Sequence, residues 1–319
     1  MESTSELEDL RNTVVSIEES IGKRVIGSRR IVRFMFIALL TGNHILLEGV
    51  PGLAKTMLAN EFARHTKMEF KRIQFTPDML PSDITGTIMF NIESRKMEFK
   101  EGPLFANVVL ADEINRTPPK VQSALLEAME EVHVTVGGET HSLPKPFFVI
   151  ATQNPVEQEG TFPLAEALMD RFLFRYYLDY PSREDEINIL NSMGNSEDPS
   201  IVLLPDEIMH FRSEVDNVYV SDEIKEYIVD LMRKTREDEL VYLGASPRTT
   251  SKYIKAARAN ALISGRSYVI PEDILYMAFE ILNHRLILKP EAVVDETDDI
   301  KNIVKRIVDK VVSETPYPK

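Results

Sequence analysis

The chain has 319 residues, of which 43% are hydrophobic and 28% are charged, and its formal net charge is -14. This length favours two domains, and the composition is that of a globular protein able to bury a full core. The absence of cysteine excludes disulfides, thiolate zinc sites and thiol nucleophiles.

Charge and hydropathy also limit the location and the partners. The polar, acidic residues Met1 to Thr4 do not resemble the start of a signal peptide, and the longest apolar run, Phe34 to Leu40, is too short to span a bilayer. We therefore expect a cytoplasmic protein with no membrane span. The excess of 51 acidic over 37 basic residues argues against nucleic acid as the main partner, because neutralised phosphates supply most of such affinity.

Apolar runs alternate with helical patterns over the first part of the chain. Two helices are expected, one over residues 55–64 and another that Thr117 caps, with Pro118 as its first residue. This alternation predicts an α/β domain with a central parallel sheet over residues 1–181. The expected strands are residues 44–48, 69–75, 106–111, 147–152 and 172–178.

Two segments of this domain have the pattern of hairpins. Residues 87–100 contain two apolar strands around a polar turn. Residues 132–143 begin with valines that alternate with polar residues and then reach the turn Gly137-Gly138. Periodicity alone favours the interpretation that both hairpins only decorate the edge of the sheet.

From residue 182 onward the pattern is that of helices only. Helices are expected to start near Ser182, Ser221, Ser246 and Ile270, and amphipathic stripes predict a small bundle. A loop is expected over residues 199–205 and a last helix over residues 298–312. Residues 182–319 are therefore predicted to form a small all-α domain.

A glycine-rich turn follows the first expected strand and opens a helix. Such a turn lets backbone N–H groups close around phosphates at a helix N-terminus. Lys55 would reach the β- and γ-phosphates, and the hydroxyl of Thr56 would be a ligand of Mg²⁺. The general pattern has glycine where Ala54 stands, and alanine satisfies that position if its φ is negative. The turn consists of Gly49, Val50, Pro51, Gly52, Leu53, Ala54, Lys55 and Thr56.

Polar residues also follow the third and fourth expected strands. Asp112 and Glu113 end an apolar strand, where an aspartate can hold Mg²⁺ and a glutamate can deprotonate the attacking water. A solvated pair of carboxylates is the alternative, which the preceding phosphate loop disfavours. Asn154 can hydrogen-bond the γ-phosphate and the water, although Asn-Pro is also a common turn. These residues predict ATP as the substrate and Mg²⁺ as the cofactor.

The order of these motifs resembles that of the MoxR family of AAA+ ATPases. The resemblance extends from about Val14 to the C-terminus, and alanine is usual in this family at position 54. It rests on residues 49–56, 111–120, 151–155, 162–172, 244–248 and 283–285.

The resemblance implies roles for residues outside the phosphate loop. Asn154 matches sensor 1, and Arg171 matches the arginine finger that acts on the ATP of a neighbouring subunit, with Arg116 as the second candidate. Arg248 matches sensor 2 of a helical lid, which would move against the α/β domain. From the residues alone, surface ion-pair residues are the better explanation of these arginines.

Two further assignments concern the adenine and the idle state of Glu113. Val25, Ile26 and Gly27, which precede the first expected helix, match the segment that covers adenine, although core packing explains them nearly as well. Gln74, at the end of the second strand, is a candidate to hold Glu113 in an idle position.

The resemblance also implies a biological role. It implies a homo-oligomeric, hexameric ring whose pore is lined by both hairpins, and a chaperone-like remodeller that matures partner proteins or inserts their metal cofactors. These clients would carry a von Willebrand factor A domain. The alternatives are the ATPase subunit of a metal chelatase, a nucleic-acid motor, which the net charge disfavours, and a binding module that rarely turns over, which Glu113 disfavours.

Overall fold

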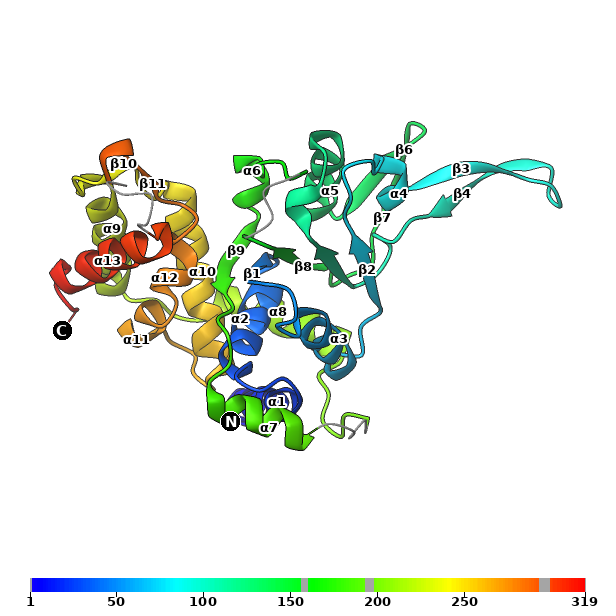
Figure 1. Ribbon diagram of the computed structural model, residues 1–319. Helices are drawn as coiled ribbons and strands as arrows, with labels where there is room; N and C mark the ends of the chain where they lie inside the picture. The colour runs from blue at the N-terminus through cyan, green and yellow to red at the C-terminus, as the bar shows by residue number, and fades with distance from the viewer. Residues whose placement is uncertain (1, 156–159, 193–197, 293–298, 319) are drawn as a thin grey trace. The chain divides into compact units, whose positions relative to one another are not determined.

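The computed structural model describes residues 2–155, 160–192, 198–292 and 299–318 (Figure 1). The chain divides into two compact units. The sheet unit comprises residues 13–172 and 176–211, and the helical unit comprises residues 1–12, 173–175 and 212–319. The described residues between 182 and 211 group with the sheet in this division, and the domain boundary at residue 181 stays a prediction from the sequence.

A five-stranded sheet forms the centre of the first unit, in the order β2-β5-β8-β1-β9. The pairs β2/β5, β5/β8 and β8/β1 are parallel, which confirms the predicted α/β fold. The first strand has the expected bounds, and the ends of the other strands lie within two residues of the expected ones. The strands are β1 (His44–Glu48), β2 (Phe70–Gln74), β5 (Val108–Asp112), β8 (Phe148–Gln153) and β9 (Phe172–Tyr177).

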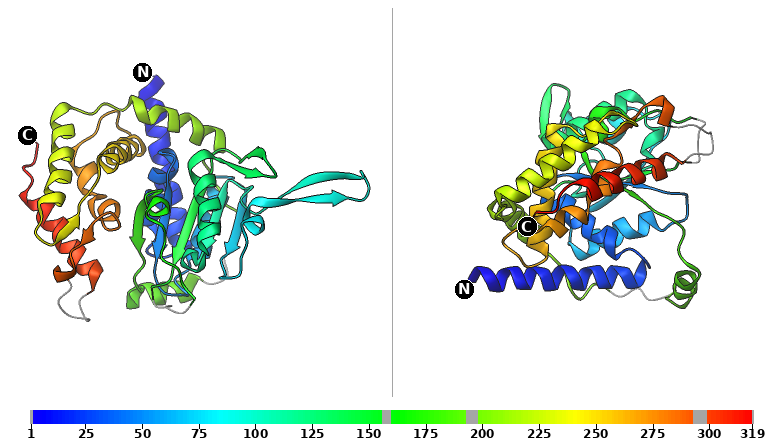
Figure 2. Two further views of the ribbon diagram at one scale, coloured as in Figure 1. Left: turned by 90° about the horizontal axis from the view of Figure 1, so that it is seen from above. Right: turned by 90° about the vertical axis from the view of Figure 1, so that its left-hand side faces the viewer.

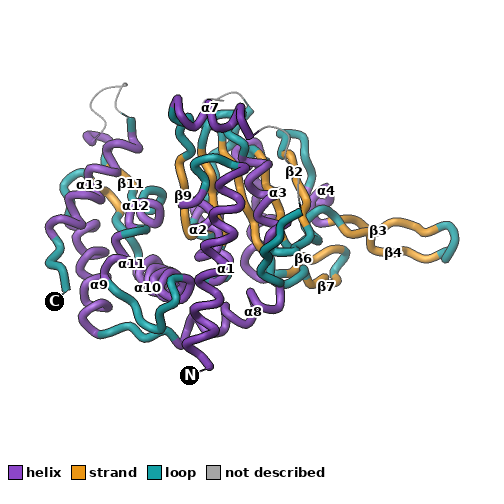
Figure 3. Tube along the Cα trace, turned by 90° about the horizontal axis from the view of Figure 1, so that it is seen from below, coloured by secondary structure: helices purple, strands orange, loops and turns teal. Residues whose placement is uncertain are grey.

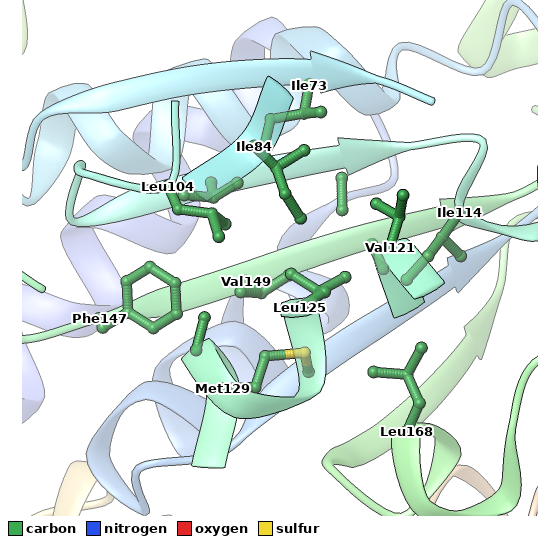
Figure 4. Close-up of a cluster of buried hydrophobic side chains, with 14 of the residues drawn as sticks. Ile73, Ile84, Leu104, Ile114, Val121, Leu125, Met129, Phe147, Val149 and Leu168 are labelled. Carbon is green, nitrogen blue, oxygen red and sulfur yellow. The ribbon is translucent and has the colours of Figure 1, made fainter. Parts of the chain in front are cut away.

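Helices cover both faces of this sheet. On one face, Phe148 of β8 contacts Phe62 of α3 (Lys55–His65), and Phe62 contacts Phe36 of α2 (Arg29–Leu40). On the other face, Val149 belongs to a buried cluster with residues of α4 (Pro81–Thr85), α5 (Pro119–Glu131) and α6 (Glu166–Met169) (Figure 4). Figure 3 shows the strands of the sheet in orange beside the purple helices α2 and α3. Because both faces are buried, the central strands are continuously apolar rather than alternating.

Both predicted hairpins are confirmed, and each forms a two-stranded sheet of its own. The first, β3 (Gly86–Asn91) with β4 (Lys96–Glu101), extends away from the five-stranded sheet (Figure 1). The second is β6 (His133–Val136) with β7 (Glu139–Ser142). Phe99 of β4 stacks on His141 of β7 with ring centroids 3.8 Å apart, so the two hairpins pack against each other near their bases.

Two expectations about helix starts are wrong. Helix α5 begins at Pro119, one residue later than predicted, and Pro118 is its N-cap with φ -60 and ψ 151. The following proline disfavours helical angles at Pro118, so the helix cannot include it. Val25–Gly27 do not precede the first helix, because α1 (Glu2–Arg24) comes before them.

The helical unit contains most of the expected helices, and Ser221 and Ser246 cap α9 and α10 through their side chains. Helix α13 contacts α9 and α12 (Figure 2). The bounds are α9 (Asp222–Glu237), α10 (Pro247–Ile263), α11 (Pro271–Leu275), α12 (Ala278–Leu282) and α13 (Ile300–Glu314). The predicted start of the last helix, Asp298, lies outside the described residues.

The expectation of helices only after residue 182 is wrong in one detail. Strands β10 (Val241–Leu243) and β11 (Ile287–Leu288) form a small antiparallel sheet. Strands this short show no alternation that a sequence pattern can detect. Along the chain, helices α7 (Arg183–Ser192) and α8 (Pro205–Glu214) come before the helices α9 to α13 of the helical unit. Within the described ranges, no helix combines the length and the apolar character needed to cross a membrane.

Candidate active site

The glycine-rich turn joins the end of β1 to the start of α3, as predicted. Gly52 has φ 89 with open space around its missing side chain, so glycine is required there for the backbone angle alone. Gly49 is required for a different reason, because a Cβ there would lie 2.8 Å from the carbonyl oxygen of Leu178. The two glycines together let the chain turn sharply into a helix N-terminus, which is suited to bind anions.

Ala54 does not meet the condition of a negative φ under which alanine would satisfy this position without strain. Its φ is 52 and its ψ is 22, which is the left-handed conformation. An alanine in this conformation costs about 1–2 kcal/mol, and this cost explains why the general pattern has glycine at this position.

Ala54→Gly is therefore expected to raise the free energy of unfolding of the nucleotide-free chain by about 0.5–1 kcal/mol, because relief of the left-handed strain exceeds the entropic cost of glycine. Chemical denaturation measures this change. The matched control is Gly52→Ala, which should lower stability by about 1 kcal/mol for backbone reasons alone. A loss of stability in Ala54→Gly would contradict the conformation described for this turn.

Lys55 lies close to the predicted acidic pair. Its Nζ donates to the carbonyl oxygen of Gly49 at 2.5 Å. Burial lowers the pKa of Lys55, and the negative charges of Asp112, Glu113 and Glu48 oppose that change. The three carboxylates thus influence the pKa of Lys55. A site in which the lysine and the acidic pair contact the same nucleotide requires such proximity.

Asp112 and Glu113 are held at the end of β5 by a residue of β8. The Asp112 carboxylate accepts a hydrogen bond from Oγ1 of Thr152 at 2.5 Å, and the N–H of Glu113 donates to the same hydroxyl oxygen at 2.9 Å. Glu113 has φ 57, another left-handed residue that is not glycine. Its carboxylate lies 3.4 Å from a guanidinium nitrogen of Arg116. The hydroxyl of Thr152 thus links the two acids.

Asp112 is also held by Arg72, a residue that belongs to none of the sequence motifs. Arg72 of β2 donates to Oδ2 of Asp112 from Nε at 3.0 Å and from Nη2 at 2.6 Å. Arg72 also donates to Oε1 of Gln74 at 2.6 Å. Gln74 thus contacts Arg72, whereas the sequence suggested that it holds Glu113. Glu113 forms an ion pair with Arg116.

The remaining predicted residues lie at several places in the fold. Asn154 follows β8, is buried, and accepts a hydrogen bond at its carbonyl oxygen from Asn115 at 3.3 Å. Arg171 follows α6 and forms an ion pair with Glu130 of α5. Arg248 is an exposed residue in the first turn of α10, in the helical unit.

The segment predicted to cover adenine joins α1 to α2. Arg24, next to Val25, donates to both carboxylate oxygens of Glu61 at 2.6 Å. Glu61 belongs to α3, the helix that the phosphate loop opens. This ion pair tethers the segment Val25–Gly27 to that helix, which is what a base-covering segment needs.

The side chains assigned to the metal have suitable chemistry. Thr56 lies in the first turn of α3, Asp112 ends β5, and these two elements contact each other. Hydroxyl and carboxylate oxygens are the hard donors that Mg²⁺ prefers, together with phosphate oxygens and water. The donor set therefore fits a magnesium ion bound with a nucleotide.

Known proteins share both the sequence and the fold of this chain. Family models for the ATPase family associated with various cellular activities (AAA) and for the AAA lid domain match residues 44–174 and 233–306. The chain is 49% identical to YeaC of Bacillus subtilis over 89% of this chain and 90% of that protein. It is 42% identical to chaperone MoxR1 of Mycobacterium tuberculosis over 95% of this chain and 84% of the relative.

A solved structure has the same fold as this chain. A crystal structure of a protein from Cytophaga hutchinsonii superimposes with a TM-score of 0.88 at 39% identity, covering 99% of this chain and 98% of the other. Together with the relatives, this match confirms an AAA+ core followed by a helical lid. The chain belongs to the MoxR family of AAA+ ATPases.

Proposed function

We propose that the chain hydrolyses ATP in a Mg²⁺-dependent reaction at the site formed by residues 49–56, Asp112 and Glu113. The observation that carries this proposal is the placement of the phosphate loop, because the helix α3 that opens at Lys55 contacts β5, the strand that ends at Asp112. Membership in an ATPase family supports the same reaction.

Each residue has a distinct part in this reaction. Lys55 neutralises charge on the β- and γ-phosphates, Glu113 accepts the proton of the attacking water, and Asn154 orients that water. Thr56 and Asp112 would hold Mg²⁺, which when bound neutralises charge on the phosphate oxygens. The bond from the N–H of Glu113 to Thr152 keeps the catalytic carboxylate at the edge of the sheet.

The proposal includes a hexameric ring. Arg171 would complete the site of a neighbouring subunit, and Arg248 would act as sensor 2 from the helical lid. The membership in the AAA+ class supports an oligomeric ring, since these ATPases commonly assemble in that way.

The ring would act as a chaperone-like remodeller that matures partner proteins or inserts their metal cofactors. One relative is named a chaperone, which supports this role. The exposed apolar tip of the β3–β4 hairpin also supports it, since Phe90, Ile92 and Met97 are 59%, 82% and 64% exposed. Exposed apolar groups of this kind commonly mark protein contacts. The client would carry a von Willebrand factor A domain.

Steady-state phosphate release tests the proposal. A purified protein with a von Willebrand factor A domain should stimulate hydrolysis, and Ile92→Ser should abolish that stimulation while the basal rate persists. Ile201→Ser, which changes another exposed isoleucine of the same unit, is the matched control and should retain stimulation. Stimulation by a porphyrin with Mg²⁺ or by duplex DNA, without any effect of the protein partner, would refute the remodelling role.

A further inference from the structure

The carboxylate of Asp112 is held from both sides by residues of the neighbouring strands. On the β8 side, Oγ1 of Thr152 donates to Oδ1. On the β2 side, two nitrogens of Arg72 donate to Oδ2. The side chain of Asp112 is only 12% exposed, so these contacts replace most of the hydration that it would have in water.

Thr152 is suited to set the orientation of this carboxylate. It is 1% exposed, and its hydroxyl donates to Asp112 while it accepts the N–H of Glu113. Because this hydroxyl bonds to both residues, it fixes the peptide group between Asp112 and Glu113 as well as the side chain of Asp112. Groups that orient a metal ligand in this way usually strengthen metal binding.

Arg72 acts on the same carboxylate through its charge. Its guanidinium lies against Oδ2 and is also bonded to Gln74, so its position is defined by two partners. This positive charge compensates a nearly buried carboxylate in the nucleotide-free chain. It also repels a divalent cation and neutralises part of the negative charge of Asp112 that would attract one, so Arg72 opposes metal binding.

We propose that Thr152 and Arg72 are positioning residues that set the Mg²⁺ affinity of the nucleotide site in opposite directions through their contacts with Asp112. Thr152 raises the affinity by orienting the carboxylate, and Arg72 lowers it by sharing the carboxylate's charge. This inference rests on the proposed function, since it assigns Asp112 to the Mg²⁺ site. A purely structural role would not give changes of opposite sign.

Calorimetric titration of ADP into the full chain at a series of Mg²⁺ concentrations tests the inference without hydrolysis. The quantity measured is the Mg²⁺ concentration that gives half of the maximal change in ADP affinity. Thr152→Val removes the hydroxyl at nearly constant shape and should raise this concentration about tenfold or more. Arg72→Met removes the charge and should lower it by about threefold, because this ion pair is partly exposed and screened.

The matched controls are Thr152→Ser and Arg72→Lys, which keep the hydroxyl and the charge and should stay near the wild-type value. Thermal unfolding of each nucleotide-free variant identifies any that fail to fold. If Thr152→Val is one of them, Thr152→Ala against Thr152→Ser carries the test of the hydroxyl. A higher Mg²⁺ requirement in Arg72→Met, or no difference between Thr152→Val and Thr152→Ser, would overturn the inference. If the wild-type chain bound no ADP at any Mg²⁺ concentration, the proposed function itself would fail.

Discussion

Glu113→Gln should lower the steady-state rate of ATP hydrolysis by about 10²–10⁴-fold, because an amide cannot accept the proton of the attacking water. The variant should still bind ATP, since the backbone N–H of residue 113 keeps its bond to Thr152 whichever side chain follows. Phosphate release and ATP retention measured on the same sample separate these two effects. We expect the trapped nucleotide to stabilise the proposed ring against dissociation.

The control for this experiment is Glu131→Gln, which changes an exposed glutamate at the end of α5. It should leave both hydrolysis and ATP retention unchanged. Hydrolysis by Glu113→Gln at close to the wild-type rate would show that another group activates the water.

Arg171→Ala should lower hydrolysis by about 10³–10⁵-fold, the range found when an arginine finger is absent from related phosphoryl-transfer sites. In the structure Arg171 is held by an ion pair with Glu130, so its guanidinium has a defined position before any neighbour is present. If Arg171 acts on the ATP of a neighbouring subunit, the loss should depend on which subunits share a ring.

Mixing of inactive variants tests that dependence. Lys55→Met lacks its own phosphate contact but retains Arg171, whereas Arg171→Ala has the reverse defect. A mixture of the two should regain hydrolysis, because a Lys55→Met subunit can supply its arginine to a neighbour. The corresponding mixture with Arg116→Ala should stay inactive, because Arg116 lies beside Glu113 of its own chain. If the mixture with Arg116→Ala regained hydrolysis and the mixture with Arg171→Ala did not, Arg116 would be the arginine finger instead of Arg171.

The central sheet could be predicted from the sequence because its strands are buried on both faces. Residues 44–48 and 108–112 are buried throughout, and each ends at a polar motif. Runs of this kind have little ambiguity when glycine or charged residues bound them. The hairpin at Gly137-Gly138 was predictable for a similar reason, since both glycines have the positive φ that a short turn requires.

The contacts around Asp112 could not be predicted in the same way. Arg72 and Thr152 each lie 40 positions from Asp112 along the chain, and only the pairing of β2, β5 and β8 brings them together. A sequence pattern reports the order of the elements but not which side chains meet across neighbouring strands. The left-handed φ of Ala54 could not be predicted either, because the resemblance to a family justified the residue type without specifying its backbone angle.

The helix at the N-terminus was missed although its pattern is readable. Leu10, Val14, Ile17 and Ile21 are all buried and recur at helical spacing along α1. The small β10/β11 sheet, in contrast, has no signal of that kind in its two short strands.

The central claim is that a nucleotide binds between Lys55 and the acidic pair at the end of β5. Calorimetric titration of ADP with saturating Mg²⁺ into the wild-type chain, Lys55→Met and Lys67→Met tests it most directly, since Lys67 is an exposed lysine just beyond the far end of the same helix. The wild type and Lys67→Met should both bind ADP, whereas Lys55→Met should show a large loss of affinity. Equal affinities of all three proteins would contradict it.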